Sequence, residues 1–143
     1  MTSDKTISTG GCLCGQVRYE VTGPLRGVVN CHCTMCQKLH GSFGAHSKAL
    51  KSDIRITEDQ GLAWYRTSDV ARRGFCRNCG SSLFWDPYEL DATGILAGSL
   101  DGETGLETIG HIFVAEKADF CVLDDALPKF DASSDGALSM DFK

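Results

Sequence analysis

Short runs in which apolar and polar residues alternate recur along this chain and predict a mainly β protein. In the clearest run, Val17, Tyr19 and Val21 alternate with polar residues, and a turn signal follows at Gly23. Clusters of Gly, Asp, Ser and Thr separate similar short runs at residues 28–30, 54–56, 62–65, 83–85, 95–97 and 111–114. We expect these segments to pair mostly as antiparallel strands of small sheets.

Helical signals are scarce. Residues 34–40 can form one or two turns, with Thr34 as the N-cap and Gly41 just past the end. A second short turn is expected to begin at Asp86, with Pro87 at its first helical position. The 16 glycines and 3 prolines suit a chain with many tight turns.

Length and composition predict one globular domain. The chain has 143 residues, of which 42% are hydrophobic, enough for a core and too many for bulk disorder. Residues 1–9 are polar and are expected to be a flexible N-terminus, residues 10–130 the domain, and residues 131–143 a flexible tail.

The charge balance argues against nucleic acid as a partner. The 14 Lys and Arg residues face 19 Asp and Glu residues, for a formal charge of -5, so no basic surplus is left to meet phosphates. The polar start lacks the apolar region of a secretory signal, and no apolar run reaches the roughly 20 residues that span a bilayer. We therefore expect a cytoplasmic protein whose thiols stay reduced.

Seven of the eight cysteines fall into three clusters, which are Cys12 and Cys14, then Cys31, Cys33 and Cys36, then Cys76 and Cys79. Two cysteines that flank one residue of a strand point to the same face, so their sulfurs can converge on one ion. A Cys-x-x-Cys-Gly segment presents two sulfurs from a tight turn. Because zinc accepts four thiolates tetrahedrally, the clusters predict zinc binding.

Sequence distance divides these ligands into two sites. The trio Cys31, Cys33 and Cys36 lies within six residues of chain and should share one metal ion. The two remaining pairs together complete a closed four-sulfur site. A closed site is structural, whereas three protein ligands with an open fourth position are typical of catalytic zinc.

Other uses of the cysteines remain open. An even cysteine count is compatible with disulfides, and Cys76 with Cys79 resembles a redox dithiol, although no helical context surrounds it. The trio can also be a purely structural site that His32 or another side chain completes. Iron–sulfur spacings do not match. Cys121, in an apolar setting, is expected to be a core thiol.

The cysteine motifs and their surroundings resemble the glutathione-dependent formaldehyde-activating enzyme family, which includes relatives of centromere protein V. The resemblance covers nearly the whole chain in the order of the family. Its segments are residues 10–19 (GGCLCGQVRY), 30–36 (NCHCTMC), 73–81 (RGFCRNCGS), 98–101 (GSLD), 111–114 (HIFV) and 124–130 (DDALPKF).

This resemblance implies a β-tent fold, a set of small antiparallel sheets pinned by zinc. It implies about two zinc ions per chain, a structural one on Cys12, Cys14, Cys76 and Cys79 and a catalytic one on Cys31, Cys33 and Cys36. The family's reaction is of the carbon–sulfur lyase type and joins formaldehyde to glutathione as S-(hydroxymethyl)glutathione. The implied partners are a small thiol such as glutathione and a small aldehyde or other electrophile. The alternative is a non-catalytic, zinc-stabilised module that binds a protein or a thiol.

Some residues near the motifs have less certain roles. Many family members place an arginine where this chain has Gln37, so other cations must meet the carboxylates of glutathione, and the candidates are Lys38, Arg66, Arg72 and Arg73. Strand alternation turns His32 away from the cysteines beside it.

His111 is expected in the core or behind a ligand, the pair at 124–125 in a turn, and His40 and His46 have no distinguishing context. Four aromatic residues are expected in the core, namely Trp64, Phe75, Phe84 and Trp85.

Overall fold

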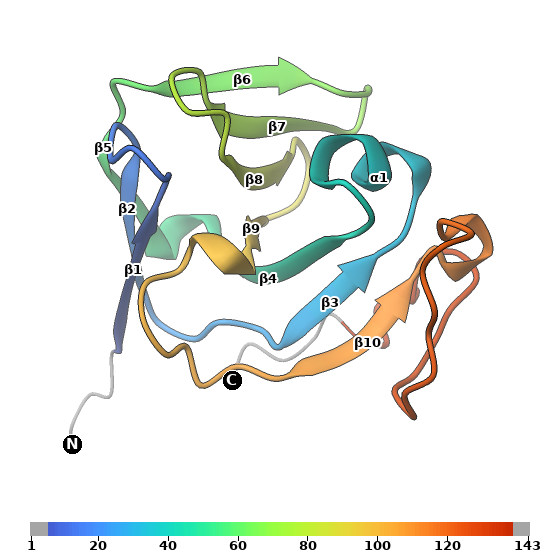
Figure 1. Cartoon of the computed structure of the whole chain (residues 1–143). Helices are drawn as coiled ribbons and strands as arrows, with labels where there is room; N and C mark the ends of the chain where they lie inside the picture. The colour runs from blue at the N-terminus through green and yellow to red at the C-terminus, as the bar shows by residue number, and fades with distance from the viewer. Residues whose placement is uncertain (1–5, 139–143) are drawn as a thin grey trace.

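The computed structural model describes residues 6–138 and contains ten strands and few helical turns in that range (Figure 1). The strands are β1 (Ile7–Gly11), β2 (Arg18–Thr22), β3 (Val28–Cys31), β4 (Gly44–Leu50), β5 (Ile54–Glu58), β6 (Leu62–Arg66), β7 (Ala71–Cys76), β8 (Ser82–Pro87), β9 (Ala92–Leu96) and β10 (Thr108–Ile112). The helical elements are α1 (Thr34–His40) and the single 3₁₀ turns η1 (Lys51–Asp53), η2 (Ala97–Ser99) and η3 (Val114–Glu116).

The strands form two sheets, a small one in the order β1-β2-β5 and a larger one in the order β10-β3-β4-β9-β8-β7-β6. All pairs are antiparallel except β10 with β3, which run parallel. The larger sheet curves between its edge strands β6 and β10, which lie at opposite ends of the view in Figure 1. The expected architecture, mainly β with small antiparallel sheets, is confirmed.

Each of the seven expected strand segments overlaps an observed strand, whereas β1, β4 and β7 were not expected. The sequences of these three strands, ISTGG, GAHSKAL and ARRGFC, show no alternation of large apolar residues with polar ones. Hydrogen bonding to neighbouring strands, rather than their own side-chain pattern, therefore holds them in the sheets.

A compact apolar core lies where the two sheets meet. Tyr19 of β2 packs edge-on against Phe84 of β8 with ring centroids 5.2 Å apart, and Val17, Leu83 and Ile95 are fully buried around them. The Tyr19 hydroxyl lies 2.6 Å from Ser99 Oγ, so its polar end is satisfied inside the core. The packing of Tyr19 against Phe84 joins the small sheet to the larger one.

Of the four aromatic residues expected in the core, only Phe84 is deeply buried. Trp64 is 36% exposed, and the Arg72 guanidinium lies 3.7 Å from the centre of its ring as a cation–π pair. Phe75 and Trp85 are half-buried. Cys121 is also half-buried beside exposed neighbours, so its prediction as a core thiol is wrong.

The helix at Thr34–His40 is confirmed, but its cap differs from the prediction. Cys33, not Thr34, is the N-cap, because the Cys33 Sγ atom accepts the Cys36 backbone N–H at 3.3 Å. Gly41 ends the helix in the left-handed conformation at φ 96°, as expected.

The helical turn predicted at Asp86 is wrong, since β8 continues through Pro87. The Asp86 carboxylate does not cap a helix. It accepts hydrogen bonds from Arg72 Nε at 2.8 Å and from Thr93 Oγ1 at 2.9 Å, which holds the segment extended.

The segment after β10 packs back onto the sheet. The Phe113 N–H donates to the Ala132 carbonyl at 2.9 Å, and Leu138 is 8% exposed. Residues 1–5 and 139–143 of the predicted flexible ends lie outside the described residues, and the boundaries proposed at residues 9 and 130 stay predictions. Among the helices of residues 6–138, none has the length and apolar character needed to cross a bilayer.

Candidate metal centres

Four sulfurs from distant parts of the chain converge at the start of the small sheet. The Sγ atoms of Cys12, Cys14, Cys76 and Cys79 all lie within 4.8 Å of one another. Two of the separations, Cys12–Cys14 and Cys14–Cys76, are 3.7 Å. Zn–S bonds of about 2.3 Å in a tetrahedron place the sulfurs about 3.8 Å apart, so this cluster fits a zinc ion.

Turns, rather than a strand face, bring these sulfurs together. Strand β1 ends at Gly11, and Cys12 and Cys14 lie in the bend that follows, so the expectation that both lie on a strand is wrong. Cys76 ends β7, and the turn after it closes through Gly80, whose φ is 82° and whose N–H donates to the Cys76 carbonyl at 2.7 Å. Backbone N–H groups also point at the sulfurs, as at Cys76 Sγ, which accepts the Cys79 N–H at 3.4 Å.

A second cluster contains Cys31, Cys33 and Cys36, whose Sγ atoms also lie within 4.8 Å of one another. Cys31 ends β3, Cys33 caps α1, and Cys36 is buried in the first turn of α1. Among residues 6–138, no fourth Cys, His, Asp or Glu ligand atom lies that close to all three sulfurs. The trio therefore has three protein donors, the pattern of an open metal site.

His32 does not complete the trio. Its side chain is fully buried, and its Nε2 atom lies 3.0 Å from His111 Nδ1 on the neighbouring parallel strand. His111 Nε2 in turn lies 2.9 Å from Asp125 Oδ2. Since the carboxylate can only accept, His111 donates from Nε2 and accepts from His32 at Nδ1. Burial lowers the pKa of His32 and so favours a neutral ring, whose proton lies on the donating Nε2 atom.

Two further histidines lie beside the trio, although nothing in the sequence distinguished them. His40 of α1 and His46 of β4 have a ring nitrogen within 4.8 Å of each other and of Cys36 Sγ. Burial lowers the pKa of His40 to about 4 and that of His46 to about 3, so both rings are neutral at pH 7. His46 Nε2 is buried without a hydrogen-bond partner among the described residues.

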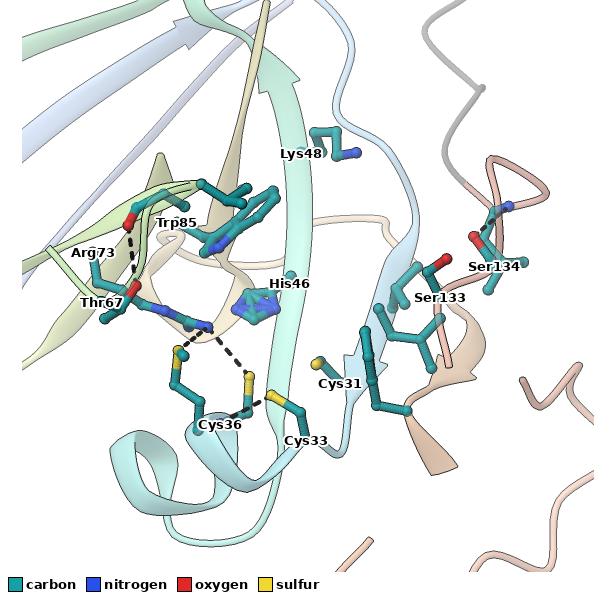
Figure 2. A pocket seen from close by; sticks show the side chains of 18 of the residues that line it. Cys31, Cys33, Cys36, His46, Lys48, Thr67, Arg73, Trp85, Ser133 and Ser134 are labelled. Carbon is teal, nitrogen blue, oxygen red and sulfur yellow. Dashed lines mark hydrogen bonds between the residues drawn. The ribbon is translucent and has the colours of Figure 1, made fainter. Parts of the chain in front are cut away.

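The trio opens into a cavity of about 430 Å³ (Figure 2). Its walls are largely apolar and include Val29, Val70, Trp85, Ile112 and Leu138. The four-sulfur cluster contributes no residue to this wall. A small ligand in the cavity can therefore reach the trio, whereas the four-sulfur cluster lies outside this cavity and already offers four protein donors.

A buried arginine lies against the trio. Arg73 of β7 is 8% exposed, and its Nη2 atom lies 3.7 Å from Cys36 Sγ and 3.6 Å from Met35 Sδ. Its Nη1 atom lies 3.5 Å from His40 Nε2. Figure 2 shows the guanidinium extending from β7 toward Cys36. The pKa of Cys36 is raised overall: the contact with Cys31 lowers it, the contact with Cys33 and burial raise it, and the charge of Arg73 opposes the rise.

The four basic residues proposed to bind substrate carboxylates do not converge on one site. Arg66 pairs with Asp69 at 3.1 Å, Arg72 pairs with Asp86 at 2.8 Å, and Lys38 lines a different cavity. Of the four candidates only Arg73 lies in the cavity of the trio, where Arg26 and Lys48 join it. No sequence motif marks Arg26 and Lys48 as site residues, because only the folding of the chain brings them into this cavity.

Comparison with known proteins identifies the family of this chain. The family model for the glutathione-dependent formaldehyde-activating enzyme matches residues 7–116, which include both cysteine clusters. A protein of Schizosaccharomyces pombe described as an uncharacterized lyase is 30% identical over 90 residues, which cover 58% of this chain and 64% of that protein. The chain thus spans less than two thirds of the length of this curated relative.

A solved structure shares the fold of this chain. The crystal structure of a Rhodobacter sphaeroides protein aligns with a TM-score of 0.56 and 27% identity, covering 68% of this chain and 91% of that one. The family match extends over most of the chain and contains every cysteine of the two clusters. The chain therefore belongs to the glutathione-dependent formaldehyde-activating enzyme family.

Proposed function

We propose that this protein is a zinc-dependent enzyme of the carbon–sulfur lyase type that acts on the adduct of a small thiol and a small aldehyde, as in S-(hydroxymethyl)glutathione synthesis. The observation that carries the proposal is the position of three cysteine sulfurs in the wall of a cavity of about 430 Å³. Family membership supports the reaction class. We place this activity in the cytoplasm, where thiols are kept reduced.

The donor sets of the two clusters suit different roles. We assign a structural zinc to Cys12, Cys14, Cys76 and Cys79 and a second zinc to Cys31, Cys33 and Cys36, about two ions per chain. Cys31, Cys33 and Cys36 would hold this second ion, which would supply the positive charge that keeps a substrate thiol deprotonated. Three thiolates already weaken the Lewis acidity of such an ion, which favours thiol capture over polarisation of the aldehyde.

The residues around the trio prepare the reaction in this proposal. The Arg73 guanidinium offsets negative charge beside Cys36, and the apolar wall excludes water that would hydrate the aldehyde. The substrate sulfur attacks the carbonyl carbon, a C–S bond forms, and the carbonyl π electrons move to oxygen. The oxygen takes up the proton that the thiol lost, so thiol and aldehyde combine without a further reactant.

The test compares formation of S-(hydroxymethyl)glutathione with and without zinc-loaded protein, followed by NMR against the fast uncatalysed reaction. We expect acceleration that Cys36→Ser abolishes. The matched control is Cys121→Ser, because Cys121 is a half-buried cysteine outside both clusters and should leave the rate unchanged. Thiol binding without acceleration of any thiol–aldehyde reaction would replace the enzyme by a zinc-stabilised binding module.

A further inference from the structure

The His46 side chain in the cavity of the trio is left without a hydrogen bond. His46 of β4 is half-buried and lines the cavity, its Nε2 atom is buried without a partner, and its Nδ1 atom forms no hydrogen bond within residues 6–138. A buried polar group without a partner destabilises a fold, so native structures contain few such groups. The unpartnered ring therefore indicates that a polar group enters the cavity.

The hydroxyl groups of the same wall already have partners. Ser47 Oγ donates to the Arg26 carbonyl at 2.6 Å, and Thr67 Oγ1 donates to the Ala71 carbonyl at 3.2 Å. The remaining hydroxyl groups are hydrogen-bonded within their own turns and belong to Ser68, Ser133 and Ser134. Among the hydroxyl and imidazole groups of the described wall, only that of His46 is free to bind a ligand.

His46 lies at the sulfur end of the cavity. One of its ring nitrogens lies within 4.8 Å of Cys36 Sγ, whereas Lys48 follows two residues later on β4, about 7 Å farther along the strand. Figure 2 shows the His46 ring between the three sulfurs and Lys48. In a thiol–aldehyde adduct the oxygen is two bonds from the sulfur. An adduct whose sulfur lies beside Cys36 therefore brings its oxygen to the His46 ring.

The His46 ring is in the form that can donate to such an oxygen. Burial, followed by the charge of Arg73, lowers the pKa of His46 to about 3, so the imidazole is neutral at pH 7. A neutral imidazole has one N–H donor and one acceptor nitrogen, and either nitrogen of His46 can carry the proton because neither has a partner among residues 6–138. The ring can thus offer an N–H to the cavity without a change of charge.

We propose that His46 is a catalytic residue whose imidazole N–H donates a hydrogen bond to the oxygen of the aldehyde and of the adduct that forms from it. The proposal rests on the proposed function and adds the group that meets the reacting oxygen. When the sulfur attacks the carbonyl carbon, the C–S bond forms, the π electrons move to oxygen, and the N–H stabilises the negative charge there. The oxygen then takes up the proton that the thiol released, and the imidazole stays neutral throughout.

Binding of two thiols of equal size tests this hydrogen bond apart from the reaction. 2-Mercaptoethanol has a hydroxyl where 1-propanethiol has a methyl group, and calorimetry gives the affinity of each for the zinc-loaded full chain. In His46→Phe, which keeps a ring in the wall, we expect the ratio of the two affinities to shift about fivefold toward 1-propanethiol, as for one neutral hydrogen bond. An unchanged ratio would overturn the proposal.

His40→Phe is the matched control. His40 also has a ring nitrogen within 4.8 Å of Cys36 Sγ, but it does not line the cavity and its Nε2 atom faces Arg73. We expect the affinity ratio of this variant to equal that of wild type. Nitrogen-15 NMR of the wild-type imidazole rings needs no substitution, and 2-mercaptoethanol should shift a ring nitrogen of His46 more than 1-propanethiol does. An equal response to both thiols would contradict the hydrogen bond.

The reaction itself separates this inference from the proposed function. His46→Phe should lower kcat for S-(hydroxymethyl)glutathione formation by about tenfold or more and leave the affinity for glutathione unchanged, because only the aldehyde brings the oxygen. A merely structural His46 would lower both. A hydroxyl preference that depends on His46, without acceleration of any thiol–aldehyde reaction, contradicts the proposed function and leaves the hydrogen bond standing. Acceleration that persists in full in His46→Phe contradicts this inference alone.

Discussion

His32 Nε2 lies 3.0 Å from His111 Nδ1, and this contact joins the segment between two trio cysteines to the neighbouring strand β10. Strands β3 and β10 are far apart in sequence and run parallel, so the contact depends on their register, in which His111 pairs with Asn30. Both imidazole rings are buried, and the Asp125 carboxylate accepts the hydrogen bond from His111 Nε2. The chain of hydrogen bonds thus fixes the backbone from which Cys31 and Cys33 project.

Replacing His111 by Phe keeps a ring of similar size but removes both hydrogen bonds. The buried His32 Nε2 is then left unsatisfied, which costs about 1–3 kcal/mol of unfolding free energy. Denaturant unfolding of the zinc-loaded protein measures this loss. The control is Asp124→Asn, since Asp124 is exposed, and it should change stability by less than about 0.5 kcal/mol. A similarly small loss in His111→Phe would show that the chain of hydrogen bonds does not stabilise the fold.

We expect the stability of the fold to depend on pH through the Asp86 carboxylate, which lies outside both cysteine clusters. Burial alone would raise its pKa, but hydrogen bonds from Arg72 and Thr93 outweigh burial and lower it. A carboxyl group whose pKa is lower in the folded chain contributes stability above its unfolded value of about 3.9, and loses it as the pH falls through the folded value. Asp86→Asn should therefore be less stable than wild type near pH 6, with a difference that shrinks below about pH 4.

Unfolding midpoints of both proteins between pH 6 and pH 3 measure this difference. The matched control is Asp69→Asn, which removes an exposed carboxylate and should shift little, because surface ion pairs contribute little. Loss of metal in acid affects all three proteins alike and cancels in the comparison. A difference for Asp86→Asn that stayed constant with pH would mean that its carboxylate has no lowered pKa.

The clearest strand that the sequence predicted has side chains that face the core. Val17, Tyr19 and Val21 alternate because one face of β2 is buried against the larger sheet. Strand β4 has no such pattern, since one of its faces lines the cavity with His46 and Lys48. The only sign in the sequence of β4 was that His46 and Lys48 stand two positions apart between small residues. This pattern is too common to identify a site.

The cysteines could be grouped from their spacing, because side chains that can share one metal ion leave a local pattern, and the structure brings each group together. The cations of the cavity could not, since Arg26, Lys48 and Arg73 come from three separate segments that only the sheet order brings together. Cys33 as helix cap was missed for a different reason. Thr34 is the stronger capping residue by preference, but the turn between β3 and α1 already points the Cys33 sulfur at the helix N-terminus.

The turn beside the four-sulfur cluster requires a left-handed backbone conformation at Gly80. Its φ is 82°, a left-handed value that costs a residue with a side chain about 1–2 kcal/mol, although a Cβ atom there would meet nothing within 4 Å. Gly80→Ala should lower the unfolding free energy by about that amount. Gly98→Ala is the matched control, because Gly98 has equal space and no positive φ. Equal stability of the two variants would exclude backbone strain as the reason for glycine at this position.

Loss of one cysteine cluster should affect the fold differently from loss of the other. Cys12 and Cys76 of the four-sulfur cluster are part of the main apolar core, whereas Cys31, Cys33 and Cys36 lie outside that cluster of buried residues and face the cavity. Structural zinc contributes on the order of 10–16 kcal/mol in small metal modules, comparable with the stability of a whole domain, about 5–15 kcal/mol. Cys79→Ser should therefore prevent folding, and Cys33→Ser should leave a folded chain.

Soluble yield, circular dichroism and elemental analysis of zinc test this division. We expect Cys33→Ser to keep its β-sheet spectrum with about one zinc ion per chain, and wild type to carry about two, with the second ion removed first by a mild chelator because three protein ligands hold less tightly than four. Cys121→Ser controls for the loss of a thiol and should match wild type in all three measurements. If Cys79→Ser and Cys33→Ser were tolerated equally, the assignment of a structural zinc to the four-sulfur cluster would fall.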